Sequence, residues 1–370
     1  MSSRQARHTA GCREPFASRL LAWWERHGRH DLPWQHPRTP YRVWVSEIML
    51  QQTQVATVIP YFERWMERFP ALPDLAGAAL DDVLSHWSGL GYYARARNLH
   101  KAAVNCMAQF GGELPTTPEQ LQELPGIGAS TANAIVSQSQ DVPAAVLDGN
   151  VRRVLARHAC VEEWTGSTAA QKTLWAEAEK RLPNRRGADY TQAVMDLGAI
   201  VCTRSRPACG DCPVNGDCRA LAANAVNRLP APKPATRVRE RTIYLLVLLD
   251  RAGHVLLERR PPAGIWGGLW SLPEADTSEG FTDTLGIRID EDNLLAPREH
   301  RLSHRKLSLH PVLAHTGQPG QVKCSAQQDW FPLAGFATGG PDQPGLPRPV
   351  ADLLREIALQ RADTRTAGTE

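Results

Sequence analysis

Four of the eight cysteines lie close together, with the spacing C-x6-C-x2-C-x5-C: Cys202, Cys209, Cys212 and Cys218. Four thiolates so close in sequence can enclose one metal centre, and zinc and iron–sulfur clusters both accept four cysteines. The other four cysteines are scattered, and in a reducing compartment such clustering favours metal over disulfides. The thiolate chemistry therefore predicts a metal site without choosing between zinc and iron–sulfur.

A second feature is the segment LPGIG at residues 124–128, which joins two stretches of helical periodicity. A hairpin this tight needs Gly126 and Gly128, because glycine tolerates unusual backbone angles and leaves amide groups uncovered. Together with the N-terminus of a helix expected near Ser130, these amides form an anion site suited to one phosphate. A plain turn between packed helices is the alternative.

A third feature is a carboxylate among apolar residues. Glu47 lies within the stretch 44–50, and on a helix it shares one face with Gln51 and Gln54. If this face lines a buried pocket, desolvation raises the pKa of Glu47 and keeps the acid protonated. The pattern alone leaves an ordinary surface carboxylate as the alternative.

Helices must position these features, because residues 1–228 carry apolar residues at spacings of three and four. One helix start is legible in Thr117, Pro118 and Gln120, which offer an N-cap, a first-turn proline and a capping box. Residues 229–240 are then rich in proline and arginine, which predicts an extended cationic linker.

Strands are predicted after the linker. The apolar run 243–249 and a turn at 253–254 begin an α+β domain that is expected to span 241–357. The polar tail 358–370 is expected to be disordered. The fold class is therefore multidomain, with an all-α part followed by an α+β part.

Composition sets the outer limits. A chain of 370 residues exceeds one ordinary core, so two or three domains are expected. A net charge of +3 neither demands nor excludes a nucleic-acid partner. No apolar run reaches the roughly 18 residues of a membrane span. The polar N-terminus is unlike a secretion signal, so the expected location is the cytoplasm, in association with the nucleoid.

The cysteine spacing resembles the cluster loop of the endonuclease III and MutY family of DNA repair enzymes. In that family the loop holds a 4Fe–4S cluster, so the resemblance implies one such cofactor on the four clustered cysteines. Three cations lie in or beside the loop and could contact phosphate: Arg204, Arg206 and Arg219.

Two further stretches, WVSEIMLQQT at 44–53 and GLGYY at 89–93, resemble MutY in particular. The match covers most of residues 20–222. It implies a helix-hairpin-helix glycosylase with a hairpin lobe at about 36–144 and a cluster lobe built from the N-terminal helices plus about 145–228. The implied activity is removal of adenine mispaired with 8-oxoguanine or guanine in double-stranded DNA.

The resemblance also assigns the chemistry. The family's catalytic aspartate falls on Asp148, which is expected to stay ionised and to stabilise or trap the oxocarbenium-like sugar. Glu47 is expected to protonate a ring nitrogen of adenine, and Asn150 to hold Asp148 or a water. Members that also nick DNA carry a lysine nucleophile where this chain has Ser130. Since a hydroxyl cannot form a Schiff base, little or no lyase activity is expected.

Reaching adenine requires flipping the nucleotide out of the duplex. The resemblance assigns wedge roles to Gln52 and Tyr92 and leaves a contact at His30 unassigned, because the family often has lysine or arginine there. The expected DNA- and base-binding residues of the helical part are Trp34, Leu50, Gln51, Gln52, Tyr92, Gly126, Gly128 and Gln192.

Residues 241–357 resemble the nudix-like domain with which this family inspects 8-oxoguanine, with GGLWSLP at 267–273 as the recognisable core. The stretch 274–289 lacks the glutamate-rich arrangement that binds magnesium, so recognition without hydrolysis is expected. Ser303 and His304 match the loop placed against 8-oxoguanine. Leu302 stands where the family usually has phenylalanine, which weakens stacking.

Three rival functions follow from the same features. A bifunctional glycosylase–lyase acting on oxidised pyrimidines is opposed by Ser130 and by the second domain. A non-catalytic damage-binding protein is opposed by the intact pair Glu47 and Asp148. A nudix pyrophosphatase is opposed by the missing metal box. The favoured expectation is a monomeric adenine DNA glycosylase with no membrane partner.

Overall fold

The computed structural model describes residues 14–234, 239–262, 264–302, 305–317, 325–338 and 343–367. The chain forms two compact units, one made of residues 1–55 and 105–234 and the other of residues 56–104 and 235–370. No helix in the described ranges has the length and apolar character needed to cross a membrane.

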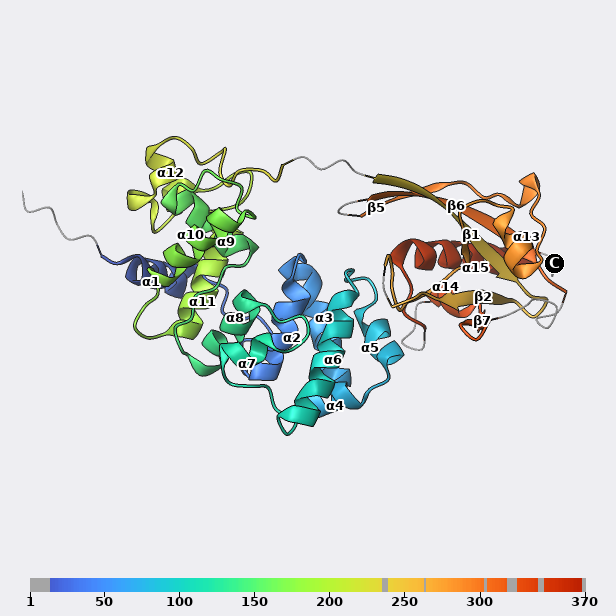
Figure 1. Ribbon diagram of the computed structural model, residues 1–370, viewed down its shortest axis with the longest axis horizontal. Helices are drawn as coiled ribbons and strands as arrows, with labels where there is room; N and C mark the ends of the chain where they lie inside the picture. The colour runs from blue at the N-terminus through green and yellow to red at the C-terminus, as the bar shows by residue number, and fades with distance from the viewer. Residues whose placement is uncertain are drawn as a thin grey trace, which may run out of the picture. The chain divides into compact units, whose positions relative to one another are not determined.

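The first unit is helical, as predicted (Figure 1), and one cluster of buried apolar residues joins several of its helices. Its elements are α1 (Phe16–His27), α2 (Pro40–Leu50), α7 (Pro118–Gln122), α8 (Ala129–Gln140), α9 (Gly149–Ala159), α10 (Thr168–Glu179), α11 (Gly187–Asp196), η1 (Leu197–Val201), η2 (Cys209–Asp211), η3 (Asn215–Asp217) and α12 (Arg219–Ala222).

Side chains before the first turn fix where several of these helices begin. Thr39 and Thr117 each accept a hydrogen bond from a first-turn backbone N–H, and a proline follows each of them. Ser167 caps α10 and Asp148 caps α9 in the same way. These caps satisfy N–H groups that have no partner within the helix, so the starts are set by local sequence, as predicted for Thr117.

The second unit combines four helices with the C-terminal sheet. Its elements are α3 (Val55–Arg68), α4 (Leu72–Gly77), α5 (Leu80–Trp87), α6 (Ala94–Gln109), β1 (Arg239–Leu249), β2 (His254–Arg259), β3 (Trp270–Ser271), β4 (Glu274–Ala275), α13 (Gly280–Leu285), η4 (Glu291–Asn293), β5 (Arg298–Arg301), β6 (Arg305–His315), β7 (Gln328–Pro332), α14 (Gly335–Thr338) and α15 (Arg348–Ala367). α3 begins and α6 ends in the first unit.

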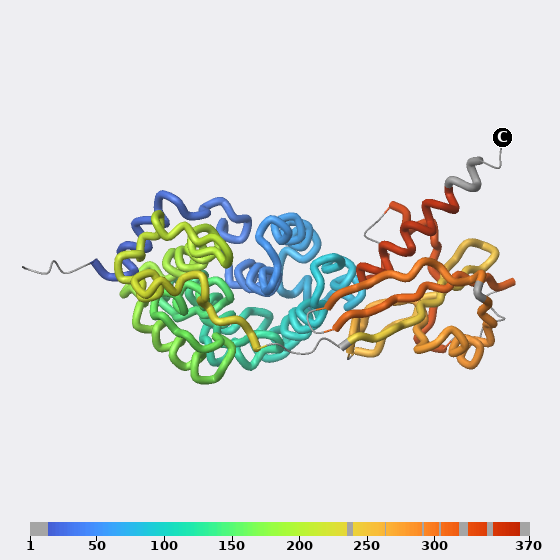
Figure 2. The backbone as a smooth tube through the Cα atoms, turned by 90° about the horizontal axis from the view of Figure 1, so that it is seen from above, coloured from blue at the N-terminus to red at the C-terminus, as the bar shows by residue number. Residues whose placement is uncertain are grey.

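The sheet has the order β3-β2-β1-β6-β5, with β4 also paired to β1 and β7 to β2. β1 runs parallel to β6, and the remaining pairs are antiparallel. Alternate β1 residues enter two different cores, so both faces of the sheet are covered. α14 and α15 cover one face and α13 covers the other (Figures 1 and 2).

The structure departs from two predicted boundaries. The tail expected to be disordered from residue 358 continues α15 as far as Ala367, and its first residue, Ala358, is buried in the domain core. The expected linker is partly packed, since Leu229 is buried and Ala231 forms a bridge with Trp164.

Residues 56–104 belong to the same compact unit as the C-terminal domain, whereas the hairpin glycines belong to the first unit, so the hairpin lobe predicted at about 36–144 spans both units. The Tyr93 hydroxyl donates to the Leu346 carbonyl at 2.9 Å. Gly345 lies so close to Leu84 that an added Cβ would be 3.1 Å from its side chain. Apolar packing and hydrogen bonds between segments about 250 residues apart therefore build this unit.

Candidate active site and cluster loop

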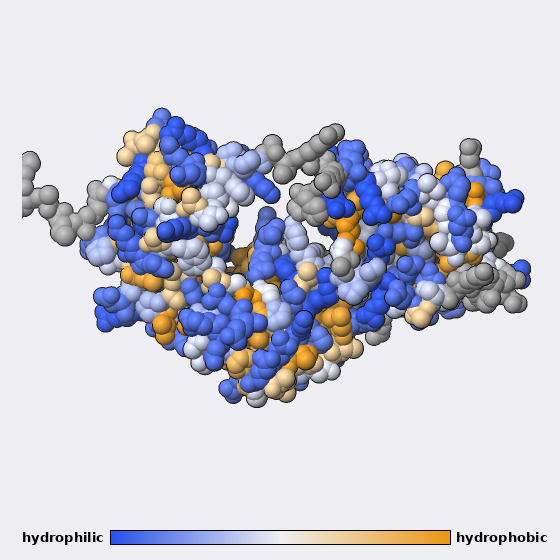
Figure 3. Space-filling model, viewed as in Figure 1, coloured by the Kyte–Doolittle hydropathy of each residue, from blue (hydrophilic) through white to orange (hydrophobic). Residues whose placement is uncertain are grey.

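One cleft in the first unit is lined by six of the predicted residues: Trp34, Glu47, Leu50, Asp148, Asn150 and Gln192. They come from the loop before α2, from α2 itself, from α9 and its cap, and from α11. The surface between α9 and α2 is hollowed in Figure 3. The fold thus joins two carboxylates with apolar and amide side chains in one concave site.

Glu47 lies on α2 with part of its surface open to the cleft. Gln138 of α8 donates from Nε2 to Oε1 of Glu47 at 2.9 Å. Burial, and then the negative charge of Asp148, raise the pKa of Glu47 to about 7, while the Gln138 hydrogen bond opposes this rise. Glu47 is therefore suited to donate a proton near neutral pH. Sequence reasoning missed Gln138.

Asp148 is held at the N-terminus of α9, where its Oδ1 accepts the Val151 backbone N–H at 2.7 Å. Burial raises the pKa of Asp148, and the Val151 and Asn150 N–H groups and the arginines Arg153 and Arg152 act against that rise. A helix N-terminus favours a negative charge. The two carboxylates thus face one cleft in different environments. N–H donors and arginines lie near Asp148, whereas a single amide contacts Glu47.

The hydroxyl of Ser130 accepts the Leu147 backbone N–H at 2.9 Å. Leu147 directly precedes Asp148, so Ser130 fixes the chain that presents the carboxylate. The hydrogen-bond partner of Ser130 is therefore a backbone N–H group. Because Ser130 lies on α8, this bond connects the helix after the hairpin to the start of α9.

The side chain of Asn150 is oriented by a cation, since its Oδ1 accepts from Arg153 Nη2 at 2.8 Å. Asn150 contributes its backbone N–H to Asp148. Gly198, in the π-helical turn η1, lies so close that an added Cβ would be 2.7 Å from the Cβ of Asn150. Asn150 thus contacts Asp148 through its backbone, and the predicted role of its side chain, holding Asp148 or a water, stays a prediction.

A buried acid that sequence reasoning missed organises one wall of the cleft. Asp196 is fully buried and accepts from Gln192 Nε2 at 2.8 Å and from Arg29 Nη2 at 2.6 Å. The Trp24 indole N–H is a further donor, at 3.0 Å. Gln192 and Arg29 both line the cleft, so Asp196 sets the orientation of an amide and a cation there.

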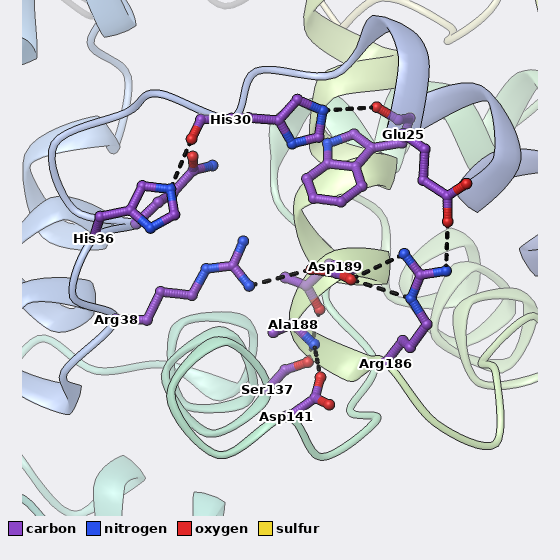
Figure 4. A network of polar contacts seen from close by, with 12 residues as sticks. Glu25, His30, His36, Arg38, Ser137, Asp141, Arg186, Ala188 and Asp189 are labelled. Carbon is purple, nitrogen blue, oxygen red and sulfur yellow. Dashed lines mark hydrogen bonds and ion pairs between the residues drawn. The ribbon is translucent and has the colours of Figure 1, made fainter.

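The loop that carries Trp34 into α2 is held by polar contacts (Figure 4). A ring nitrogen of His36 contacts the His30 carbonyl at 2.8 Å, and one of His30 contacts the Trp24 carbonyl at 3.0 Å. Arg38 pairs with Asp189 of α11 at 3.3 Å. His30 therefore contributes to the contacts that hold this loop, and it lines a pocket that is separate from the cleft.

The helical face predicted for Glu47, Gln51 and Gln54 is wrong beyond Leu50, because α2 ends there and Gln51 is its C-cap. Gln54 still reaches the cleft, through the turn that follows the helix. The left-handed backbone of Gln52, with φ of 59°, belongs to that turn. Gln52 itself is exposed.

Tyr92, the second predicted wedge, also has a left-handed backbone, with φ of 50°, and its side chain is 50% exposed. The turn beneath it is rigid, since buried Arg95 donates to the carbonyls of Leu90 and Gly91 at 3.1 Å. An exposed aromatic ring on a braced turn is suited to enter a base stack.

The hairpin joins α7 to α8 as predicted. Gly126 has φ of +83°, which favours glycine, whereas Gly128 has φ of −94° and needs no such freedom. A Cβ added at Gly128 would meet nothing within 4 Å, and no side chain caps α8. Gly128 therefore leaves open space over uncapped N–H groups, where an anion can bind.

The four clustered cysteines line one pocket, and none of the four forms a disulfide. Among the described residues, no group of His, Cys, Asp or Glu converges closely enough to hold a single metal ion. Buried Arg157 donates to Cys202 Sγ at 3.3 Å and to the Thr203 carbonyl at 2.7 Å. Four thiolate ligands that line one pocket, with a cation beside them, are a donor set that a 4Fe–4S cluster accepts.

The surroundings of this cavity suit a role in positioning. Arg204, Arg206 and Arg219 are exposed, and Arg204 also lines the cleft. Arg153 links the two sites, because its Nε donates to the Cys202 carbonyl at 2.7 Å and its Nη2 contacts Asn150. A filled cluster cavity would hold this backbone, and the exposed cations with it, in place.

In the C-terminal domain, Ser303 and His304 lie outside the described residues. Leu302 donates its N–H to the Arg305 carbonyl at 2.8 Å, which closes the turn between β5 and β6. Its side chain packs against the domain core, and the expectation that leucine here weakens stacking stays a prediction. α13, in the stretch that lacks the nudix metal box, spans only six residues and carries one acid, Asp283.

Comparisons with known proteins agree with this arrangement. Residues 45–180 match the HhH-GPD superfamily base excision DNA repair protein family. Residues 202–218 match the iron–sulfur binding domain of endonuclease III, and residues 244–356 match the NUDIX domain. The expected 4Fe–4S cofactor and the two-part fold are thereby confirmed.

Individual relatives agree as well. The adenine DNA glycosylase of Buchnera aphidicola subsp. Baizongia pistaciae is 34% identical over 92% of this chain and 96% of the relative. The adenine DNA glycosylase of Mus musculus is 39% identical over 70% of this chain and 60% of the relative. A solved thermostable thymine-DNA glycosylase superposes with a TM-score of 0.52 at 26% identity, over 56% of this chain and 95% of that one. The chain therefore belongs to the adenine DNA glycosylase family, and is a DNA glycosylase of base-excision repair that acts on DNA and carries an iron–sulfur cluster.

Proposed function

We propose that this enzyme hydrolyses the N-glycosidic bond of adenine paired with 8-oxoguanine or guanine and leaves the DNA backbone intact. The observation that carries the proposal is the shared cleft of Glu47 and Asp148, two carboxylates held in different environments. The similar proteins are adenine DNA glycosylases, and we therefore take adenine as the nucleobase that this enzyme removes.

In this mechanism the flipped adenine enters the cleft and Glu47 protonates a ring nitrogen, which makes the base a better leaving group. As the bond breaks, positive charge develops on the sugar. Ionised Asp148 stabilises that charge or traps it. Burial raises the pKa of Asp148, and the N–H groups at the start of α9, with Arg153 and Arg152, act against that rise and favour the ionised form.

The remaining cleft residues orient the base. Trp34 and Leu50 provide apolar walls, and Gln192, fixed by Asp196, presents an amide to the base edge. The hairpin at Gly126 and Gly128 binds a phosphate. Gln51, Gln52 and Tyr92 lie against the duplex and fill the space that the flipped nucleotide leaves. The four clustered cysteines hold the 4Fe–4S cluster.

Specificity for 8-oxoguanine is assigned to the C-terminal domain, through Ser303 and His304. The adenine pocket contacts the same base whichever partner lies opposite, so the discrimination has to come from elsewhere. This domain reads the lesion without nudix hydrolysis. The enzyme works as a monomer in the cytoplasm, where it associates with the nucleoid.

The test is single-turnover excision on duplexes with adenine opposite 8-oxoguanine, guanine or thymine, with and without alkali. Wild-type protein should excise from the first two, and strands should break only after alkali. Glu47→Gln and Asp148→Asn should each lower the rate by at least ~100-fold, as for loss of a general acid or of charge stabilisation, while binding to the mispair persists. Near-normal rates in both variants would exclude the mechanism.

Strand breaks without alkali would instead favour a bifunctional enzyme. Replacing both Ser303 and His304 with alanine should reduce the preference for 8-oxoguanine over guanine. An unchanged preference would show that these residues do not read the lesion.

A further inference from the structure

The contact between Glu47 and Gln138 brings together two buried helices of the first unit. Gln138 lies on α8, ten residues after the hairpin glycine Gly128, and is only 4% exposed. Its Nε2 is 2.9 Å from Oε1 of Glu47. The neighbouring Ser137 is also buried and contacts the Thr191 hydroxyl at 2.8 Å, so this part of α8 is fixed from two sides.

A protonated carboxyl group has two unlike oxygens. One carries the proton, and the other is a carbonyl oxygen and the better acceptor. Because an amide N–H can only donate, the oxygen of Glu47 that faces Gln138 Nε2 acts as the acceptor. The proton of the acid then resides on the other oxygen, Oε2.

We propose that Gln138 is a positioning residue that holds Oε1 of Glu47 and thereby assigns the transferable proton to Oε2. This inference rests on the proposed role of Glu47 as the general acid. It adds that a neutral donor on the hairpin helix decides which oxygen delivers the proton to the base.

A neutral amide suits this role better than the alternatives. Lysine or arginine at position 138 would hold Glu47 ionised and so remove the acid. An apolar side chain would leave the carboxyl free to rotate and to place its proton on either oxygen. Glutamine restrains the group while leaving its pKa high, at about 7.

Other charged groups face the same cleft and set its electrostatics. Asp148 and Arg153 come from the start of α9, Arg29 from the loop after α1, and Arg204 from the cluster loop. Arg29 is paired with Asp196, which is fully buried. None of these groups is altered by a substitution at position 138, so a change in the pH profile reports on the contact with Glu47.

The experiment uses the full-length protein with its cluster and measures single-turnover excision of adenine opposite 8-oxoguanine between pH 5.5 and 9. Gln138→Met keeps the length of the side chain and removes the donor. The matched control is Gln140→Met, on the same helix but exposed, where Nε2 donates to the Thr116 carbonyl.

Gln138→Met should lower the maximal rate several-fold with unchanged affinity for the mispair. In the plot of excision rate against pH, the fall in rate at alkaline pH (the alkaline limb) should move up by about one pH unit, because a hydrogen bond to the carboxylate of Glu47 is lost. Gln140→Met should match wild type. Gln138→Leu is a second variant with the same expected shift, and visible absorbance and circular dichroism establish that each protein is folded.

An alkaline limb that stays in place, or moves to lower pH, in both Gln138 variants would overturn the proposal. A uniform fall in rate with no shift would likewise assign Gln138 a packing role only. Failure of the proposed function itself gives a different result, because wild-type protein would not excise adenine, or Glu47→Gln would be as active as wild type.

Discussion

Replacement of Glu47 by glutamine should stabilise the protein at alkaline pH while abolishing its activity. The pKa of Glu47 rises from 4.5 to about 7 on folding. A carboxyl group whose pKa is raised in the folded state destabilises that state at pH values where the group is ionised. Above pH 7 wild-type protein therefore bears the cost of a buried carboxylate, and Glu47→Gln does not.

The size of the effect follows from the shift. One pKa unit corresponds to about 1.4 kcal/mol, so the full shift corresponds to about 3 kcal/mol at pH 8 and to less than ~1 kcal/mol at pH 5. Glu47 is partly open to the cleft, so solvent screening reduces the expected difference between the two pH values to about 2 kcal/mol. Stability relative to the variant should thus be lost as pH rises from 4.5 through 7.

The assay is urea unfolding of wild-type and Glu47→Gln protein at pH 5 and pH 8, followed by tryptophan fluorescence. Glu179→Gln is the matched control, because Glu179 is an exposed glutamate of the same unit. The variant should gain stability over wild type at pH 8 and little at pH 5. An equal difference at both pH values would refute the reasoning that burial raises the pKa of Glu47.

Three further outcomes are expected. Ser130→Lys should introduce strand cleavage, detected by borohydride trapping of an enzyme–DNA adduct, and should slow excision because the hydroxyl that fixes the chain before Asp148 is lost; equal trapping of wild type would count against the monofunctional assignment. Arg157→Met should lower iron content and visible absorbance, since removing a buried cation from the cluster cavity costs about 3 kcal/mol; full cluster occupancy would contradict this. Tyr93→Phe should cost about 1 kcal/mol by removing the hydrogen bond to Leu346, and it should weaken the preference for 8-oxoguanine, measured as the ratio of single-turnover rates on the two mispairs; an unchanged ratio would separate this hydrogen bond from lesion recognition.

The sequence was informative where function depends on short, contiguous segments. The spacing of four cysteines indicated a metal site, and the glycines at 124–128 indicated a hairpin that exposes amides. The proline and threonine at 117–118 indicated where a helix begins, and the structure has that start. Such features are local, because a turn, a cap or a ligand loop depends mainly on residues a few positions apart.

Interactions between distant segments were decided by the tertiary structure. Gln138 and Glu47 are separated by 91 residues, and Arg29 and Asp196 by 167. Nothing in the local pattern of α8 distinguishes Gln138 from an exposed glutamine such as Gln140. Only the packing of α8 against α2 buries one of them and places it against the acid.

The protonation state of Glu47 likewise depends on both the local sequence and the tertiary structure. Its apolar neighbours in sequence made a raised pKa conditional on burial, and burial depends on which helices pack around α2. The sequence alone therefore determined which groups could take part in the chemistry. The tertiary structure determined their pKa values and orientation, because desolvation and hydrogen bonds arise from residues that are brought together only by folding.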